Sequence, residues 1–430
     1  MEKKSIDYGQ FLAMIAFVLI GIGIVFVCSA QANVSNEFSF RRVYFSFGGV
    51  IAVLVFSLIP YEWFNFPTRE EFYESVKSLL GQGSIGRFRA FCRLVRYSIL
   101  PVFMIIVAAA LLYVLLGPVR AINASRRWLI LFEGSKFEIR MQPSELIKLA
   151  VVFFEAAYIV HFGHILRKFT IYGIIKAVIR LFKGDLTLRK SIRQTLLIIP
   201  FFAVPGFYVA LIAIEDFGTA AFIAMVMFLM LVVAQTPYWQ LFTGTVVGIA
   251  GSYYYISQEQ YRMNRIIAFM DLEKATEAIK YQIVNSMTAI STGGVFGKGL
   301  GRGVYKWGYV PEDKTDFIFS IICEEIGVVG AGFVILLFIL MLMLGFIIAI
   351  KCRDPLGKVL AVGLSCAICL QAFVNIGVVT SSLPTTGIPL PFVSAGGSSL
   401  LASSLAVGLL MNIARKTARQ DIGLMEPVDE

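Results

Sequence analysis

The chain has 430 residues, of which 58% are hydrophobic and only 15% are charged, and its formal net charge is +10. A soluble domain of this length has too little interior to bury so much apolar surface. Repeated apolar runs of roughly 18 residues or more instead indicate a polytopic, all-α membrane protein. A transmembrane β-barrel is excluded, because its strands alternate in runs of about ten residues, whereas these runs are continuously apolar. The basic residues lie between the runs, so the positive charge does not indicate nucleic-acid binding.

The apolar runs predict ten membrane spans, with boundaries good to a few residues. They cover residues 11–31, 43–60, 98–117, 144–162, 195–214, 218–235, 239–256, 317–349, 357–380 and 398–414. Basic residues concentrate in segments 61–97 and 163–194 and in the C-terminal tail, so the positive-inside rule predicts cytoplasmic N- and C-termini. Residues 1–430 then form one membrane domain with two basic cytoplasmic loops. Segment 257–316 is one large extracytoplasmic loop between spans 7 and 8.

Two cytoplasmic segments predict helices that lie on the membrane surface instead of crossing it. In the first, Phe72, Val76, Leu79 and Leu80 fall on one helical face. In the second, residues 169–182 place Lys and Arg around an apolar body, which suits a helix among lipid headgroups. Packing on the membrane is the favoured interpretation for both, and a partner site is the alternative.

The residue types that bind metals give no pattern for a metal site. The six cysteines lie mostly in or beside apolar runs, which indicates neither a disulfide framework nor a zinc site. His161 and His164 stand three residues apart near the end of a span. A position at the membrane interface is preferred for them over a metal pair.

The glycine-rich stretch from Gly293 to Gly303 is the first polar motif that could carry chemistry. It is not a P-loop, because Lys298 is followed by Gly299 instead of Ser or Thr. Its backbone N–H groups, together with Lys298 and Arg302, could approach a phosphate. A flexible re-entrant turn is the equal alternative.

The segment QPSELIKLA at 142–150 is the second motif. Glu145 and Lys148 lie one turn apart on one face of the predicted helix. Ionisable side chains inside a span mark a functional site unless they form a purely structural pair. Upstream, Arg127 belongs to a basic and aromatic rim that suits a phosphorylated lipid headgroup.

Further carboxylates stand near the predicted outer face. Glu215 and Asp216 separate two spans, and Glu324 and Glu325 lie just inside another. They could act as bases or hold a divalent cation, and helix capping and interhelical pairing are the structural alternatives. The segment LPTTGIPLPFVSAGGSSLL at 383–401 predicts a broken helix that lines a cavity, with Ser398 as a substrate contact.

Taken together, these segments resemble the SEDS (shape, elongation, division and sporulation) family, of the FtsW and RodA type and closer to FtsW. The matching motifs, in the family's order, are NASRRW at 123–128, QPSELIKLA at 142–150, EDFGTA at 215–220, GGVFGKGLGRG at 293–303, PEDKTDFIFS…CEEIG at 311–327 and the 383–401 segment.

The resemblance implies a ten-span protein of the bacterial cytoplasmic membrane. The implied activity is that of a peptidoglycan glycosyltransferase, which polymerises lipid II, the undecaprenyl-diphosphate-linked disaccharide peptide, during division or elongation. The implied partners are a class B penicillin-binding transpeptidase and proteins of the divisome or elongasome.

One departure from the family pattern bears on catalysis. Family members carry an aspartate in the large loop, a few residues before a Gly-Tyr-Gln, and this aspartate is the proposed catalytic residue. The ungapped alignment places Ala275 at that position. Asp271 lies one helical turn earlier, and Glu273 and Glu277 flank the gap, so the resemblance leaves the identity of the base open.

Glycosyl transfer needs a base for the acceptor hydroxyl and positive charge for the leaving diphosphate. We expect Asp271 to be the base, with Glu277 and then Glu273 as substitutes. A divalent cation (Mg²⁺ or Mn²⁺) could assist. The remaining candidates bind substrate: Arg262, Arg265, Lys298 and Arg302 at the diphosphate, and Arg127, Glu145, Lys148 and Ser398 along the cavity.

Two other functions fit the same features. A lipid II flippase would also need ten spans, a polar cavity and broken helices, but no acid in the outer loop. A non-catalytic scaffold that activates its transpeptidase is favoured by Ala275 alone.

Overall fold

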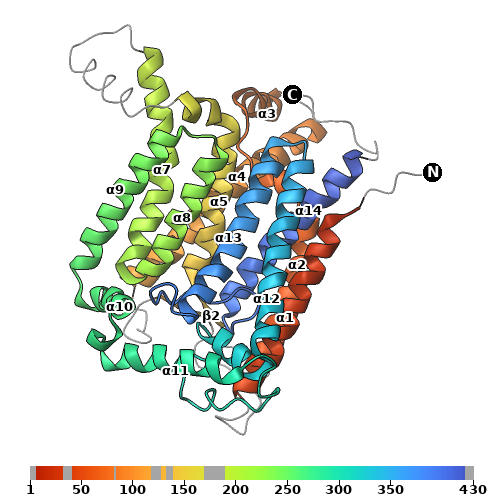
Figure 1. Ribbon diagram of the computed structural model, residues 1–430. Coiled ribbons are helices and arrows are strands. Elements are labelled where there is room, and N and C mark those ends of the chain that lie inside the picture. The colour runs from red at the N-terminus through yellow and green to blue at the C-terminus, as the bar shows by residue number, and fades with distance from the viewer. Residues whose placement is uncertain are drawn as a thin grey trace.

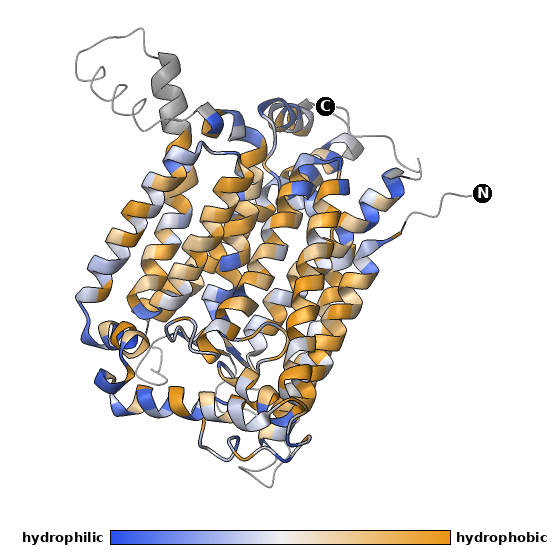
Figure 2. Ribbon diagram, in the orientation of Figure 1, coloured by the Kyte–Doolittle hydropathy of each residue, from blue (hydrophilic) through white to orange (hydrophobic). Residues whose placement is uncertain are grey.

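The computed structural model describes residues 6–31, 41–81, 84–117, 127–131, 139–168 and 189–421. Within these residues the main feature is a bundle of ten long helices, with apolar residues along the helices and polar residues towards both ends (Figures 1 and 2). These helices are α1 (Tyr8–Gln31), α2 (Arg41–Leu58), α4 (Ser84–Leu116), α5 (Pro143–Lys168), α7 (Arg189–Glu215), α8 (Phe217–Val233), α9 (Tyr238–Ser257), α12 (Ile318–Lys351), α13 (Pro355–Val379) and α14 (Gly397–Asp421).

Each of the ten predicted ranges overlaps one of these helices. Of the helices that the structure describes, seven are long and apolar enough to cross a membrane, namely α1, α4, α5, α7, α12, α13 and α14. Shorter apolar helices lie at Val43–Leu58 in α2 and at Phe217–Val233. The chain is therefore a polytopic α-helical membrane protein, and the full count of ten spans stays a prediction.

The two ends of the bundle carry different kinds of loop. Helix α3 (Arg69–Gly81), the first predicted surface helix, lies at one end and packs against the start of α4 (Figure 1). The start of α1 and the end of α14 meet, since a Cβ at Gly9 would lie 3.0 Å from Ala414 Cβ. Helices α10 (Gln260–Met270) and α11 (Glu277–Gly293) lie at the opposite end, hereafter the outer end (Figure 1). The second predicted surface helix, residues 169–182, lies outside the described residues.

Helix α13 lies at the centre of the bundle and contacts α5, α8, α12 and α14. A Cβ at Gly363 would lie 2.8 Å from both Val152 Cγ1 and Met230 Sδ, so this glycine allows close packing of α13 against α5 and α8. Helix α9 stands at the edge, where it packs against α8 and α10 and leaves Trp239 and Val247 exposed (Figure 1). Such side chains suit contact with lipid.

The predicted extracytoplasmic loop is largely helical. Helix α10 is followed by the 3-10 turn η3 (Leu272–Lys274) and then by α11, which runs across the outer end of the bundle (Figure 1). A two-stranded hairpin, β1 (Leu129–Leu131) and β2 (Ile139–Met141), lies at the same end and leads into α5.

Helix α12 is broken at Gly327, whose φ of 67° and ψ of −171° are not helical. The glycine-rich loop hydrogen-bonds to the backbone groups that the break leaves free: Lys298 N to Glu324 O, Gly299 N to Glu325 O, Val328 N to Gly294 O, and Val329 N to Val295 O. A Cβ at Gly297 would lie 2.2 Å from Glu325 O, so only glycine permits this approach. A continuous span was expected over 317–349, whereas the helix breaks directly after the acidic residues Glu324 and Glu325 and Ile326.

Candidate active site

Five charged side chains from four separate segments gather at the outer end, and we call them the outer-face cluster. They are Arg127 before β1, Asp216 between α7 and α8, Arg265 on α10, and Glu312 and Asp316 before α12. Arg127 Nη1 lies 3.3 Å from Asp216 Oδ2. The other four charges all lie near enough to Asp316 to shift its pKa. The cluster joins positive and negative groups at one polar site.

Asp216 is fixed at the start of α8, where the sequence predicted an interruption between two spans. Its carboxylate caps the helix by accepting hydrogen bonds from Thr219 N at 3.1 Å and Thr219 Oγ1 at 2.9 Å. Gln142 Nε2 is 3.5 Å from the second oxygen. Capping, one of the two predicted alternatives, therefore holds for Asp216, and the pairing with Arg127 adds a charged partner.

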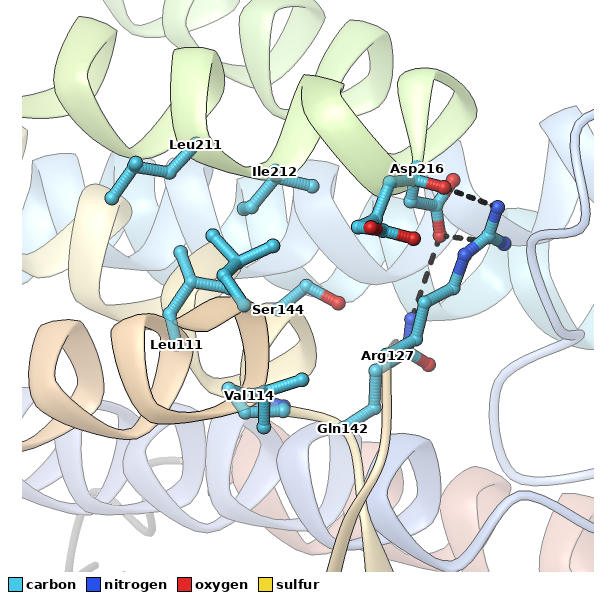
Figure 3. Close-up of a pocket in the computed structure, with 11 residues that line it drawn as sticks. Leu111, Val114, Arg127, Gln142, Ser144, Leu211, Ile212 and Asp216 are labelled. Atoms are coloured by element: carbon cyan, nitrogen blue, oxygen red, sulfur yellow. Dashed lines mark hydrogen bonds and ion pairs between the residues drawn. The ribbon is translucent and has the colours of Figure 1, made fainter. Parts of the chain in front are cut away.

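A narrow pocket opens beside Asp216 (Figure 3). It leaves about 20 Å³ of space, enough for one or two water molecules. Figure 3 shows Arg127, Gln142 and Asp216 joined by polar contacts at one end, whereas side chains such as Leu111 and Ile212 form an apolar wall. The full lining is Leu111, Val114, Leu115, Arg127, Gln142, Pro143, Ser144, Leu211, Ile212, Glu215 and Asp216.

Two arginines on α10 bind backbone carbonyls instead of carboxylates. Arg265 Nη1 donates to Thr385 O at 3.1 Å, and its Nη2 donates to Tyr261 Oη at 2.6 Å. Arg262 Nη2 donates to Ile214 O at 3.1 Å and stacks 4.2 Å from the Tyr255 ring. Within the described residues neither arginine forms a salt bridge, so each keeps charge available for an anion.

Lys298 and Arg302 were predicted to join these arginines, but Lys298 contacts α11 and α12 instead. Lys298 Nζ lies 2.8 Å from buried Glu324 Oε1 and donates to Thr292 Oγ1 at 3.1 Å. Arg302 is exposed. Protein oxygens accept from six N–H groups of residues 297–304, at Gly297, Lys298, Gly299, Gly301, Arg302 and Val304. The arrangement favours the re-entrant turn over a phosphate cradle.

Glu324 and Glu325 have structural partners. Lys306 Nζ lies 2.6 Å from Glu325 Oε1 and donates to Ser29 Oγ at 2.9 Å, with both charged side chains fully buried. Glu324 also accepts from the backbone of Val304 at 2.7 Å. Glu324 pairs with Lys298 and Glu325 pairs with Lys306, so the two acids tie the glycine-rich loop to α12. Pairing was one of the structural alternatives predicted for them.

Glu145 and Lys148 form the predicted pair inside the bundle, with 2.7 Å between Oε2 and Nζ. Lys148 Nζ also donates to Gln371 Oε1 at 2.7 Å, and Gln371 Nε2 donates to Pro389 O at 2.9 Å. The pair therefore reaches the non-helical segment between α13 and α14, residues 380–396. Ser398 is buried in the first turn of α14.

The three acids predicted as bases lie between α10 and the start of α11. Asp271 caps η3 and pairs with Lys274 at 2.8 Å, and its side chain is 41% exposed. The hydrogen bond from Lys274 lowers the pKa of Asp271 below its usual value. Glu273 and Glu277 are exposed. No contact joins these acids to the outer-face cluster among the hydrogen bonds and ion pairs described, so their catalytic role stays a prediction.

Asp316 and Glu312 were not predicted as functional residues. Both occur in the PEDKTDF motif, but their convergence with Arg127, Asp216 and Arg265 depends on the fold. Burial raises the pKa of Asp316 to about 7, helped by the negative charges of Glu312 and Asp216 and opposed by the two arginines. Burial also raises the pKa of nearby Asp313 to about 6.

The described residues contain no group of three or more His, Cys, Asp or Glu side chains that could hold a metal ion. Cys366 and Cys369 do have the C-x-x-C spacing, but they are free thiols within α13, and Cys369 Sγ donates to Phe338 O. The protein side chains therefore do not fit a metal site by themselves.

The fold and the cluster define a class of polytopic membrane protein with a charged site at its outer end. Residues 88–419 match the family model of FtsW, RodA and SpoVE, described as cell cycle protein, and the chain belongs to this family. It is a multi-pass protein of the bacterial inner membrane.

Relatives with curated names match over different lengths. The probable peptidoglycan glycosyltransferase FtsW of Bacillus subtilis is 32% identical over 96% of this chain and 91% of that protein. Stage V sporulation protein E of the same organism is 28% identical over 96% of this chain and 99% of that protein. A Geobacter protein with the same FtsW name is 39% identical, over 50% of this chain and 59% of its own length.

Solved structures share the fold. A chain of a peptidoglycan synthase complex that coordinates polymerization and crosslinking matches with a TM-score of 0.61, at 19% identity, over 95% of this chain and 98% of that one. The rod shape determining protein RodA of Thermus thermophilus matches with a TM-score of 0.55, at 20% identity, over 94% of this chain and 96% of that one.

Proposed function

We propose that this protein is a peptidoglycan glycosyltransferase that polymerises lipid II into glycan strands at the outer face of the membrane. The observation that carries the proposal is the outer-face cluster beside an apolar pocket. Arg265, which forms no salt bridge among the described residues, and Arg127, which shares Asp216, suit a diphosphate, and the apolar wall from α4 and α7 suits the start of a lipid chain. The names of the relatives agree with this activity.

In this proposal the arginines hold and stabilise the leaving diphosphate. Arg265 and Arg262 on α10 stand at the edge of the bundle, and Arg127 stands at the mouth of the pocket. Positive groups fixed in advance at a leaving group lower the barrier, because they need no reorganisation during the reaction. The charge on these arginines can serve without a protein-bound metal, and a divalent cation could arrive with the diphosphate.

We further propose a class B penicillin-binding transpeptidase as partner. The support is the likeness to a chain of a complex that both polymerises and crosslinks peptidoglycan. The FtsW names of the relatives favour division.

Purified protein should convert lipid II into glycan strands, resolved by gel electrophoresis, and the rate should rise when the cognate transpeptidase is added. If polymer is absent in every condition while the protein still activates its transpeptidase, the scaffold alternative is correct. If the protein moves lipid II across vesicle membranes and makes no polymer, it is a flippase.

A further inference from the structure

The turn before α12 holds Asp316 in a fixed position. Three consecutive carbonyl groups of this turn accept hydrogen bonds from other elements: Lys314 O from Ala395 N at 2.9 Å, Thr315 O from Ser394 Oγ at 2.6 Å, and Asp316 O from Asn375 Nδ2 at 2.7 Å. Asn375 Nδ2 also donates to Ile388 O at 2.8 Å, which joins the turn to the 380–396 segment. Backbone fixed at three successive residues fixes the position and direction from which the Asp316 side chain projects, as an active-site group requires.

The carboxylate of Asp316, in contrast to its backbone, has no partner. In the described part of the chain no hydrogen bond or ion pair reaches its oxygens, whereas Asp216, Asp271, Glu324 and Glu325 all have one. Exposed Gly387 lies beside this carboxylate, since a Cβ there would be 3.6 Å from Asp316 Oδ2. The carboxylate can therefore be approached past a residue without a side chain.

Burial is the main cause that raises the pKa of Asp316, to about 7. The negative charges of Glu312 and Asp216 act in the same direction, and the positive charges of Arg265 and Arg127 act against it. A general base works best when its pKa lies near the pH at which the enzyme operates, because it is then both ionised and basic.

We propose that Asp316 is the general base of glycosyl transfer in this protein, in place of the acid that family members carry at the position of Ala275. This proposal rests on the proposed polymerase function and deepens it. Arg265 and Arg127, which would hold the diphosphate, are the same groups that keep Asp316 partly ionised. The base and the leaving-group site thus share one cluster.

The step balances without any further reactant. The acceptor hydroxyl oxygen forms a bond with the anomeric carbon of the sugar attached to the diphosphate. Its proton passes to the Asp316 carboxylate and then to solvent. The bond between the anomeric carbon and the diphosphate oxygen breaks, and its electron pair leaves with the lipid diphosphate. No oxidant, reductant or metal is consumed.

The test compares Asp316→Asn with Asp313→Asn in the full-length protein, assayed for lipid II polymerisation with its transpeptidase. Asp313 is the matched control, because it lies in the same turn, is half-buried and also has a raised pKa. We expect Asp316→Asn to lower the rate by about 100-fold or more, since a general base contributes at least that factor. Asp313→Asn should stay within about threefold of the wild type.

A second measurement keeps the proposal testable if Asp316→Asn does not fold. The wild-type rate should rise with pH, about tenfold per unit below the midpoint, and level off above a midpoint near 7. Asp316→Glu should restore part of the rate and move the midpoint. A flat profile between pH 6 and 8, or an Asp316→Asn rate within about threefold of the wild type, overturns the proposal. If the wild type itself makes no polymer, the proposed function has failed instead.

Discussion

The two acidic regions of the outer end differ in a way that motif position alone does not reveal. Asp271, Glu273 and Glu277 lie nearest in sequence to the missing family aspartate, but they are partly or fully exposed, and Asp271 is neutralised by Lys274. Asp316 lies about 40 residues further along, half-buried, without a partner for its carboxylate among the described residues, and within electrostatic reach of two arginines. Proximity in the alignment and suitability for proton transfer therefore point to different residues.

The physical difference is the direction of the pKa shift. The hydrogen bond from Lys274 lowers the pKa of Asp271, so its carboxylate is ionised but weakly basic at neutral pH. Burial raises the pKa of Asp316 to about 7, so a proton can be taken up and released.

We expect the largest effect from the loss of the buried ion pair between Lys306 and Glu325. Lys306→Met leaves Glu325 buried without its partner and should destabilise the folded protein by about 3–5 kcal/mol. A large fall in melting temperature in detergent would show this. Asp316→Asn should leave the melting temperature almost unchanged, because it breaks no described contact. Equal falls in melting temperature in Lys306→Met and Asp316→Asn would show that Asp316 also has a structural role.

Removal of either arginine of the cluster should lower the polymerisation rate by about 100-fold, since each would stabilise the leaving diphosphate. Arg265→Gln and Arg127→Gln should also move the pH midpoint upwards, because these charges lower the pKa of Asp316. Lys280→Gln on α11 removes one positive charge from the same loop and serves as the control. If Lys280→Gln and the two arginine variants lose rate equally, the effect is one of net charge.

Glu312→Gln should move the midpoint of the pH profile downwards by up to about one unit. The negative charge of Glu312 raises the pKa of Asp316, so its loss keeps the base ionised to lower pH. The rate at pH 6 should then rise by a few-fold at most. Glutamine retains an oxygen for the 2.8 Å hydrogen bond from Thr315 Oγ1. An upward shift of the midpoint would contradict the conclusion that Glu312 raises the pKa of Asp316.

Lys274→Met should have the smallest effect. It removes the ion pair that lowers the pKa of Asp271, so that pKa should return towards its ordinary value. The pKa could be followed by NMR of the labelled carboxyl, while the polymerisation rate stays within about twofold. A larger change in rate would return Asp271 to the list of candidate bases.

The architecture was largely predictable from the sequence, because apolar runs of membrane length are a local signal. All ten predicted ranges overlap helices, and Asp216 lies where the sequence placed an interruption. The pairing of Glu145 with Lys148 also followed from helical spacing. These features depend on residues only a few positions apart.

The rest depends on contacts between distant segments. Gly327 breaks α12 just after Glu324 and Glu325, and the break holds because the glycine-rich loop satisfies its backbone. Lys298 was predicted to bind the diphosphate, but Glu324 Oε1 lies 2.8 Å from its Nζ. Burial, and then the charges of Glu312 and Asp216, raise the pKa of Asp316, and this environment is created by the fold.

The most direct measurement compares Asp316→Asn with the triple variant Asp271→Asn/Glu273→Gln/Glu277→Gln in one lipid II polymerisation assay. We predict that the triple variant polymerises within about threefold of the wild type, while Asp316→Asn loses about 100-fold or more. Full activity in Asp316→Asn together with loss of activity in the triple variant would contradict the account and return catalysis to the segment around Ala275.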